Sequence, residues 1–174
     1  MVDTLKSYYD MLMRKSKDLA VLQSTESIIG WDMETMMPPK AIKLRSEEFS
    51  LLSTIDHRMS TDPETGSLLK KAMHAPGYGK MTVEEKRNIY LIKKRYDEQT
   101  KLPEELVAAI AKQQALTVDI WKKAKAAKKY AMFRPELEKL FELEKKAASI
   151  LREAKKAKTP YDALIDIYEP KMTT

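Results

Sequence analysis

The sequence predicts an all-α protein of about seven helices in an antiparallel multi-helix array. Only 4 of the 174 residues are glycine, and the helix-favouring Ala, Leu, Lys, Glu and Met are abundant. Apolar side chains recur at three- and four-residue steps, and no segment alternates convincingly at period two. No sustained repeat or long heptad run is present. The length predicts a single helical domain, residues 1–174, with its own core.

The first two helices are predicted on either side of an irregular connection, GWDMETMMPPK, residues 30–40. The first helix runs from Asp3 to about Ile29. The second begins near Pro39 or Ala41, because proline suits the first turn of a helix. Its apolar residues are predicted to face inward: Leu44, Leu51, Leu52, Ile55 and Met59.

Capping signals place the third and fourth helices. Asp62 is predicted to cap the third, with Pro63 at its first helical position. The segment HAPGYGK, residues 74–80, ends that helix in a loop. Thr82 and Glu85 have the spacing of a capping box, which predicts a fourth helix reaching about residue 100.

Prolines mark the last three predicted helices. Pro103 begins the fifth, which runs to about Lys129, and Pro135 begins the sixth. Thr159 caps the short seventh helix and Pro160 leads it. An apolar stripe on this last helix is predicted to dock on the remainder of the fold, through Tyr161, Leu164, Ile165 and Tyr168.

Composition limits the compartment and the chemistry. The chain has no cysteine, which excludes disulfides, thiol chemistry and cysteine-based metal sites, and which fits a cytoplasmic protein. No run approaches the roughly 18 apolar residues of a membrane span, and the start, MVDTLKSYYD, lacks a signal-peptide core. We therefore expect a soluble, cytoplasmic protein with no membrane partner.

The positive charge lies in the second half of the chain. Residues 1–80 hold 11 Lys+Arg and 11 Asp+Glu, whereas residues 81–174 hold 21 and 15. The segment WKKAKAAKKY, residues 121–130, predicts a helical face with Lys122, Lys125 and Lys129, which suggests a basic module for nucleic acid or another acidic partner. A solvated face is favoured, because arginine is absent and the flanking aromatics fit core positions.

Residue types that carry catalysis are sparse. His57 and His74 lie in different helices without the H-E-x-x-H zinc motif, which predicts structural or exposed roles. Asp162, Asp166 and Glu169 share a helical face that suits a hard cation, but a solvated face is the favoured interpretation. From the residues we predict no catalytic, cofactor-binding or metal-binding site in this chain.

The connection at residues 30–40 has two interpretations. Trp31 fills a gap between helices, Asp32 accepts hydrogen bonds, and the adjacent methionines pack adaptably before Pro38 stiffens the approach to the next helix. Alternatively, these residues meet a ligand or another part of the protein. The residues alone favour the first interpretation, in which this connection fills a gap between helices.

Several segments in this order resemble the amino-terminal region of the thermostable (Taq-type) metallocarboxypeptidases. They are IIGWDMETMMPPKAIKLRSEEFSLLSTIDHRMSTDPETGSLL, RYDEQTKLPEELV, the stretch from Trp121 to Pro135, and YDALIDIYEPKMTT. The W-D-x-x-T-x-M-P and Y-D-x-L-x-D-x-Y-E-P patterns are the specific ones. The resemblance covers nearly all of the chain.

The resemblance implies an all-helical zinc (or cobalt) exopeptidase that releases C-terminal residues from peptides, often a homodimer with a deep groove. The family's H-E-x-x-H zinc site lies downstream of the matched region, and His57 matches a position that is not a zinc ligand. The chain is therefore expected to be an amino-terminal domain, a wall or lid of the groove, with the catalytic region missing after Thr174, and to be inactive alone. Its candidate groove or interdomain residues are Trp31, Asp32, Thr35, Met37 and Pro38.

Overall fold

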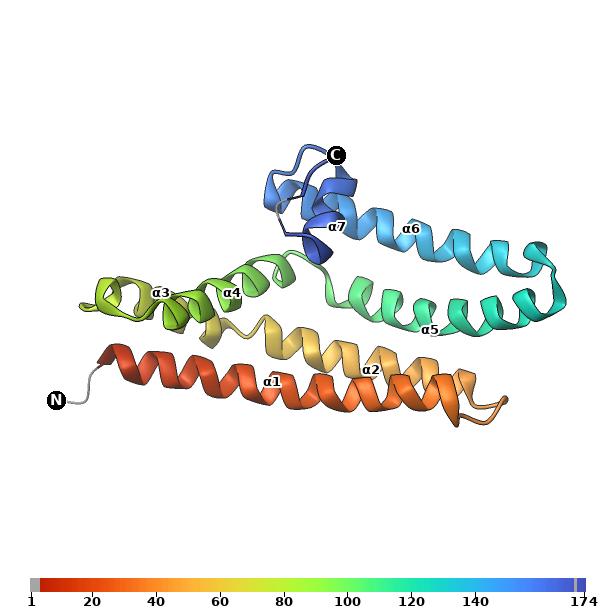
Figure 1. Cartoon of the computed structure of the whole chain (residues 1–174), viewed down its shortest axis with the longest axis horizontal. Coiled ribbons are helices and arrows are strands. Elements are labelled where there is room, and N and C mark those ends of the chain that lie inside the picture. Colours follow the sequence, from red (N-terminus) through yellow and green to blue (C-terminus); the bar gives the residue numbers. More distant parts are fainter. Residues whose placement is uncertain (1–3, 171) are drawn as a thin grey trace.

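A computed structural model describes residues 4–170 and 172–174, and confirms the all-α prediction for them. Seven α-helices and one short 3-10 helix form an elongated array (Figure 1). The helices are α1 (Thr4–Thr35), α2 (Ile42–Ser60), α3 (Pro63–His74), α4 (Val83–Gln99), α5 (Glu104–Ala127), α6 (Tyr130–Lys155) and α7 (Pro160–Tyr168), with η1 (Tyr78–Lys80) between α3 and α4.

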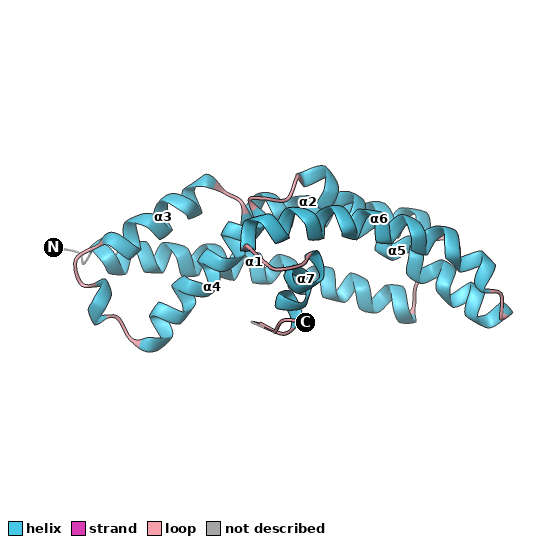
Figure 2. Cartoon of the chain, turned by 90° about the horizontal axis from the view of Figure 1, so that it is seen from above, coloured by secondary structure: helices cyan, strands magenta, loops and turns pink. Residues whose placement is uncertain are grey.

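The helices pack in two groups along the molecule. α1 and α2 run antiparallel along one side, α3 and α4 cover the amino-terminal half of α1, and the α5–α6 hairpin extends from α2 in the other direction (Figures 1 and 2). α7 lies near the middle, against the carboxyl end of α6. The array is thin, so that many helices have a side with no neighbour among the described residues.

The largest buried cluster lies where α1, α3 and α4 meet. Leu5 and Leu12 from α1 pack with Leu68 and Leu69 from α3 and with Ile89 from α4. Leu12 and Ile89 are fully enclosed. The helical step of seven between Leu5 and Leu12 places both side chains on the same face, as the periodicity predicts.

Small residues line the buried faces of the α5–α6 hairpin. Alanines are buried on both helices: Ala115 and Ala124 on α5, and Ala147 and Ala148 on α6. Lys128, in the left-handed region at φ 53°, ends α5 and begins the turn.

The predicted caps are confirmed. The Asp62 carboxylate accepts from the Glu64 amide at 2.9 Å, with Pro63 as the first residue of α3. Thr82 and Glu85 form both bonds of a capping box at the start of α4. Such caps accept hydrogen bonds from amides that have no partner within the helix. Because both partners lie within four residues of each other, the caps could be predicted from the sequence.

Two predicted helix boundaries were wrong. α1 continues to Thr35, about six residues beyond Ile29, because a single glycine costs only about 1 kcal/mol and the first proline comes at residue 38. α6 begins at Tyr130, so that Pro135 lies inside the helix. A proline this close to the helix start removes one backbone hydrogen bond and leaves the first turn intact.

Two predicted inward faces were also wrong. Leu44 and Leu51 of α2 are 65% and 62% exposed, and Ile55 and Met59 are exposed as well, because α2 packs on α1 and α5 through other faces. On α7, Tyr161 and Tyr168 are exposed whereas Asp162 is buried. α7 therefore docks through its acidic side, and part of its predicted apolar stripe faces outward.

Candidate functional site

The motif W-D-x-x-T-x-M-P spans the end of α1 and the turn into α2. Trp31, Asp32 and Thr35 are helical, and the Thr35 hydroxyl donates to the Trp31 carbonyl at 2.7 Å. The amides of Met36 and Met37 both donate to the Asp32 carbonyl, at 2.9 and 2.8 Å. The motif thus forms the carboxyl end of α1 and turns the chain toward α2.

Pro38 completes this turn. Its carbonyl accepts from the Ala41 amide at 2.9 Å, and Ala41 is the residue before α2. The Met37–Pro38 peptide bond is trans. Because a residue before proline avoids helical geometry, Pro38 accounts for the end of α1 shortly before it.

The prediction that Trp31 plugs a gap between helices was wrong. Its side chain is 62% exposed, and Met36 and Pro38 are exposed as well. The contacts of this segment with other helices are ion pairs: Asp32 pairs with Arg45 on α2, and Glu34 pairs with Lys122 on α5. Arg45 also pairs with Glu48 at 2.9 Å. The Asp32 carboxylate therefore joins α1 and α2, while the indole beside it faces away from them.

Two apolar stripes are exposed on α1 and α2. The α1 stripe comprises Val21, Ile28 and Trp31, spaced seven and three residues apart on one side of the helix. The α2 stripe comprises Leu44, Leu51 and Ile55, spaced seven and four residues apart. Exposed apolar side chains arranged in this way mark surfaces that contact another protein part.

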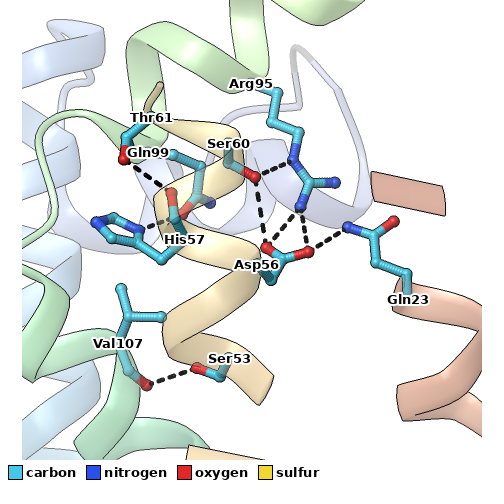
Figure 3. Close-up of polar contacts among 9 residues, drawn as sticks. All are labelled: Gln23, Ser53, Asp56, His57, Ser60, Thr61, Arg95, Gln99 and Val107. Atoms are coloured by element: carbon cyan, nitrogen blue, oxygen red, sulfur yellow. Dashed lines mark hydrogen bonds and ion pairs between the residues drawn. The ribbon is translucent and has the colours of Figure 1, made fainter. Parts of the chain in front are cut away.

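A polar cluster that the sequence did not reveal joins α1, α2 and α4 (Figure 3). The Asp56 carboxylate of α2 accepts two bonds from the Arg95 guanidinium, at 2.9 and 3.1 Å, and one from Gln23 at 2.8 Å. The Ser60 hydroxyl donates to Asp56 at 3.4 Å and accepts from Arg95 at 3.2 Å. With its charge paired in this way, Asp56 is a structural anchor.

Two ionisable groups flank this cluster. His57 is buried, and its Nδ1 lies 3.3 Å from the Gln99 side-chain oxygen (Figure 3). Glu26 on α1 has its pKa raised, first by partial burial and then by repulsion from Asp56. Neither group belongs to a metal-binding cluster among the described residues. No sequence signal pointed to Asp56, because its partner Arg95 is 39 residues away.

The acidic residues of α7 are engaged in packing. Asp166 pairs with Lys94 of α4 at 2.9 Å and with Lys155 of α6 at 3.0 Å. Asp162 forms a capping box with Thr159. The favoured interpretation as a solvated face was therefore wrong for Asp162 and Asp166, whereas Glu169 is exposed. Within residues 4–170 and 172–174, no group of three His, Asp or Glu residues could hold a metal ion. The described residues do not fit a catalytic metal.

The lysine-rich segment does not form the predicted basic face. α5 ends at Ala127, so Lys129 lies beyond the helix. Lys122 pairs with Glu34 of α1 at 2.9 Å, and Lys123 pairs with Asp119 at 2.5 Å. Lys125 lies over the Trp121 ring, with its Nζ 4.7 Å from the ring centroid. Four of the five lysines, Lys123, Lys125, Lys128 and Lys129, are exposed, in agreement with the favoured interpretation of this segment as solvated surface.

Residues 11–174 match the family model of the carboxypeptidase Taq (M32) metallopeptidases. The chain belongs to this family. Thermostable carboxypeptidase 1 of Pyrococcus furiosus is 28% identical over 163 residues, which are 94% of this chain and 32% of that protein. Thermostable carboxypeptidase 1 of Thermus thermophilus is 27% identical over 175 residues, covering 97% and 34%.

Solved structures share the fold of this chain. A crystal structure described as BsuCP superposes with a TM-score of 0.81 at 26% identity, over 98% of this chain and 32% of that one. Trypanosoma cruzi metallocarboxypeptidase 1 gives a TM-score of 0.74 at 27% identity, over 96% and 33%. The chain thus spans about a third of the length of these relatives. None of the described helices is long and apolar enough to cross a membrane.

Proposed function

We propose that this chain is the amino-terminal domain of a zinc-dependent carboxypeptidase that releases C-terminal residues from peptides. The observation that carries the proposal is the M32 family match over residues 11–174, in a chain a third as long as its relatives. The described residues contain no group that could hold a metal. The metal, zinc or cobalt, then belongs to the remaining part of the protein, and this chain alone is inactive.

In this proposal the chain forms one wall of the peptide groove. The α1 and α2 stripes support it, because their exposed apolar side chains need a covering surface. The motif residues Trp31, Asp32, Thr35, Met37 and Pro38 lie at the turn between the two helices and are the candidate contacts with peptide or with the catalytic region. A wall of this kind excludes water and orients an extended peptide toward the metal.

Two further features belong to the same proposal. We expect the complete enzyme to be a homodimer, as the family resemblance implies, and to act in the cytoplasm, which the absence of cysteine supports. Peptide is the proposed substrate.

The test begins with the gene. The reading frame beyond the codon for Thr174 should encode an H-E-x-x-H helix, and a frame without one overturns the proposal. The product of the complete frame should release the C-terminal residue of a blocked dipeptide when zinc or cobalt is present. The 174-residue chain should release none under the same conditions, and metal-dependent release by it would contradict the assignment of the metal to the remaining part.

A further inference from the structure

A pocket of about 750 Å³ opens between α4, the carboxyl end of α6 and α7. Its walls come from residues 87–98 of α4, from the α6–α7 connection, and from α7 with Pro170, Met172 and Thr173. This volume lies in the range of small-molecule sites, roughly 300–1,000 Å³. The pocket is separate from the α1 and α2 stripes and from the motif W-D-x-x-T-x-M-P, and the proposed function leaves it unused.

Acidic groups in the pocket wall are already neutralised. Lys94 and Lys155 pair with Asp166, and Lys155 also pairs with Glu98 at 3.2 Å. Asp97 pairs with a neighbouring lysine on its own helix. These pairs hold α4, α6 and α7 together and leave little charge for a ligand.

Asp162 is the remaining carboxylate in the pocket wall, and its oxygens accept hydrogen bonds from neighbouring backbone and hydroxyl groups. It accepts from the Thr159 hydroxyl at 2.7 Å and from the Thr174 amide and hydroxyl at 2.7 and 3.0 Å. These hydrogen bonds lower the pKa of Asp162 to about 2, so that its charge is stabilised by local donors.

Three cations in the same wall have no carboxylate within ion-pair distance in the part of the chain that the structure describes. They are Arg87 on α4 and Lys156 and Lys158 on the α6–α7 connection. The Arg87 guanidinium lies over the Tyr90 ring, 5.0 Å from its centroid. A planar guanidinium held in this way donates two parallel hydrogen bonds to a carboxylate or phosphate.

Apolar side chains complete the pocket wall. Tyr90, Leu91 and Met172 line it, and all three are exposed. Unpaired cations beside an aromatic and aliphatic wall match a ligand that combines one anionic group with an apolar or aromatic group. We propose that this pocket is a binding site for such a small organic anion, with Arg87 and Lys158 holding the anionic group.

The experiment is a ¹H–¹⁵N NMR titration of the 174-residue chain with phenyl phosphate. Saturable shifts are expected at the amides of residues 87–91 and 156–158. Inorganic phosphate, which lacks the ring, and benzyl alcohol, which lacks the charge, should each bind more weakly. The proposal would be overturned if no shift saturates up to about 10 mM phenyl phosphate. Only binding weaker than about −3 kcal/mol would go undetected at this concentration.

Variants separate this site from general attraction to a basic protein. R87Q/K158Q should weaken the binding of phenyl phosphate about tenfold, because two partly exposed ion pairs with the ligand are lost. R87K, which keeps the charge but loses the planar donor pair, should give a smaller loss and serves if the double variant misfolds. The matched control is K17Q/K70Q, which removes two exposed lysines outside the pocket wall. An equal loss in the control would overturn the proposal.

Discussion

Gly66 shows how a single residue sets the distance between two helices. It is buried in α3, and a Cβ at this position would lie 2.6 Å from the Tyr96 Cζ atom of α4. The tyrosine ring therefore occupies the space where any other residue would place its side chain. The constraint comes from close approach, since the Gly66 backbone itself is ordinary helix.

We predict that Gly66→Ala lowers the free energy of unfolding by about 1–3 kcal/mol, because the ring of Tyr96 must move out of its packed position. Chemical denaturation measures the change. Gly79→Ala is the matched control, since a Cβ there has no neighbour within 4 Å. If both variants unfold at the same denaturant concentration, the close packing of α3 on α4 is contradicted.

Glu26 gives a pH-dependent prediction. Burial and the nearby Asp56 raise its pKa in the folded chain, so the folded state binds the proton more tightly than the unfolded state. Its ionisation therefore costs stability, and this cost is absent below the unfolded pKa and fully present above the folded pKa.

Glu26→Gln should accordingly stabilise the chain at pH 7, by less than about 1 kcal/mol because solvent screens a partly exposed group. The gain should disappear when the pH falls below the model-peptide value of 4.5. Urea unfolding at pH 4 and pH 7 tests the difference. A variant that is less stable at pH 7 would show that the carboxylate makes a favourable contact instead.

At the scale of helices, α7 is held by ion pairs as well as by the packing of Ala163, which is fully buried. Asp166 reaches one lysine on α4 and another on α6, whereas Tyr161 and Tyr168 remain exposed. Lys155, the α6 partner, also donates to the Ala163 carbonyl at 3.1 Å. These contacts tie three helices together at one carboxylate, which explains why the acidic side of α7 faces inward.

We predict that Asp166→Asn increases hydrogen exchange of the α7 amides about tenfold, equivalent to about 1.4 kcal/mol of local opening, because two partly buried ion pairs are lost. Amides of α1 should be unchanged. Asp97→Asn is the control, because its ion pair with Lys93 is exposed and lies within one helix. Equal effects of the two substitutions would show that Asp166 does not hold α7.

At the scale of the whole molecule, the array is thin and leaves apolar surface uncovered. The α1 and α2 stripes lie on two successive helices, and the core cluster of α1, α3 and α4 does not enclose them. A self-sufficient bundle would have buried these side chains. The uncovered stripes agree with a chain that spans a third of the length of its relatives.

We predict that the 174-residue chain self-associates at high concentration through these stripes. Leu44→Glu/Leu51→Glu should shift it toward monomer, as measured by sedimentation equilibrium. Val83→Glu is the control, because Val83 is highly exposed but belongs to neither stripe. A wild-type chain that stays monomeric at high concentration would contradict the prediction.

The same double substitution also bears on the proposed function. In the complete enzyme, Leu44→Glu/Leu51→Glu should lower stability or activity if α2 contacts the catalytic region. If the enzyme is unaffected while the 174-residue chain becomes monomeric, the α2 stripe contacts a second copy only.

The sequence by itself determined the helical class, the family and the capped helix starts. Periodicity and capping act over about four residues, so Thr82 with Glu85, or Asp62 with Pro63, can be recognised locally. Only the tertiary structure decided which faces are covered, since that depends on neighbours far along the chain. In the folded chain Trp31 is exposed, Asp56 pairs with an arginine 39 residues away, and the acidic side of α7 faces inward.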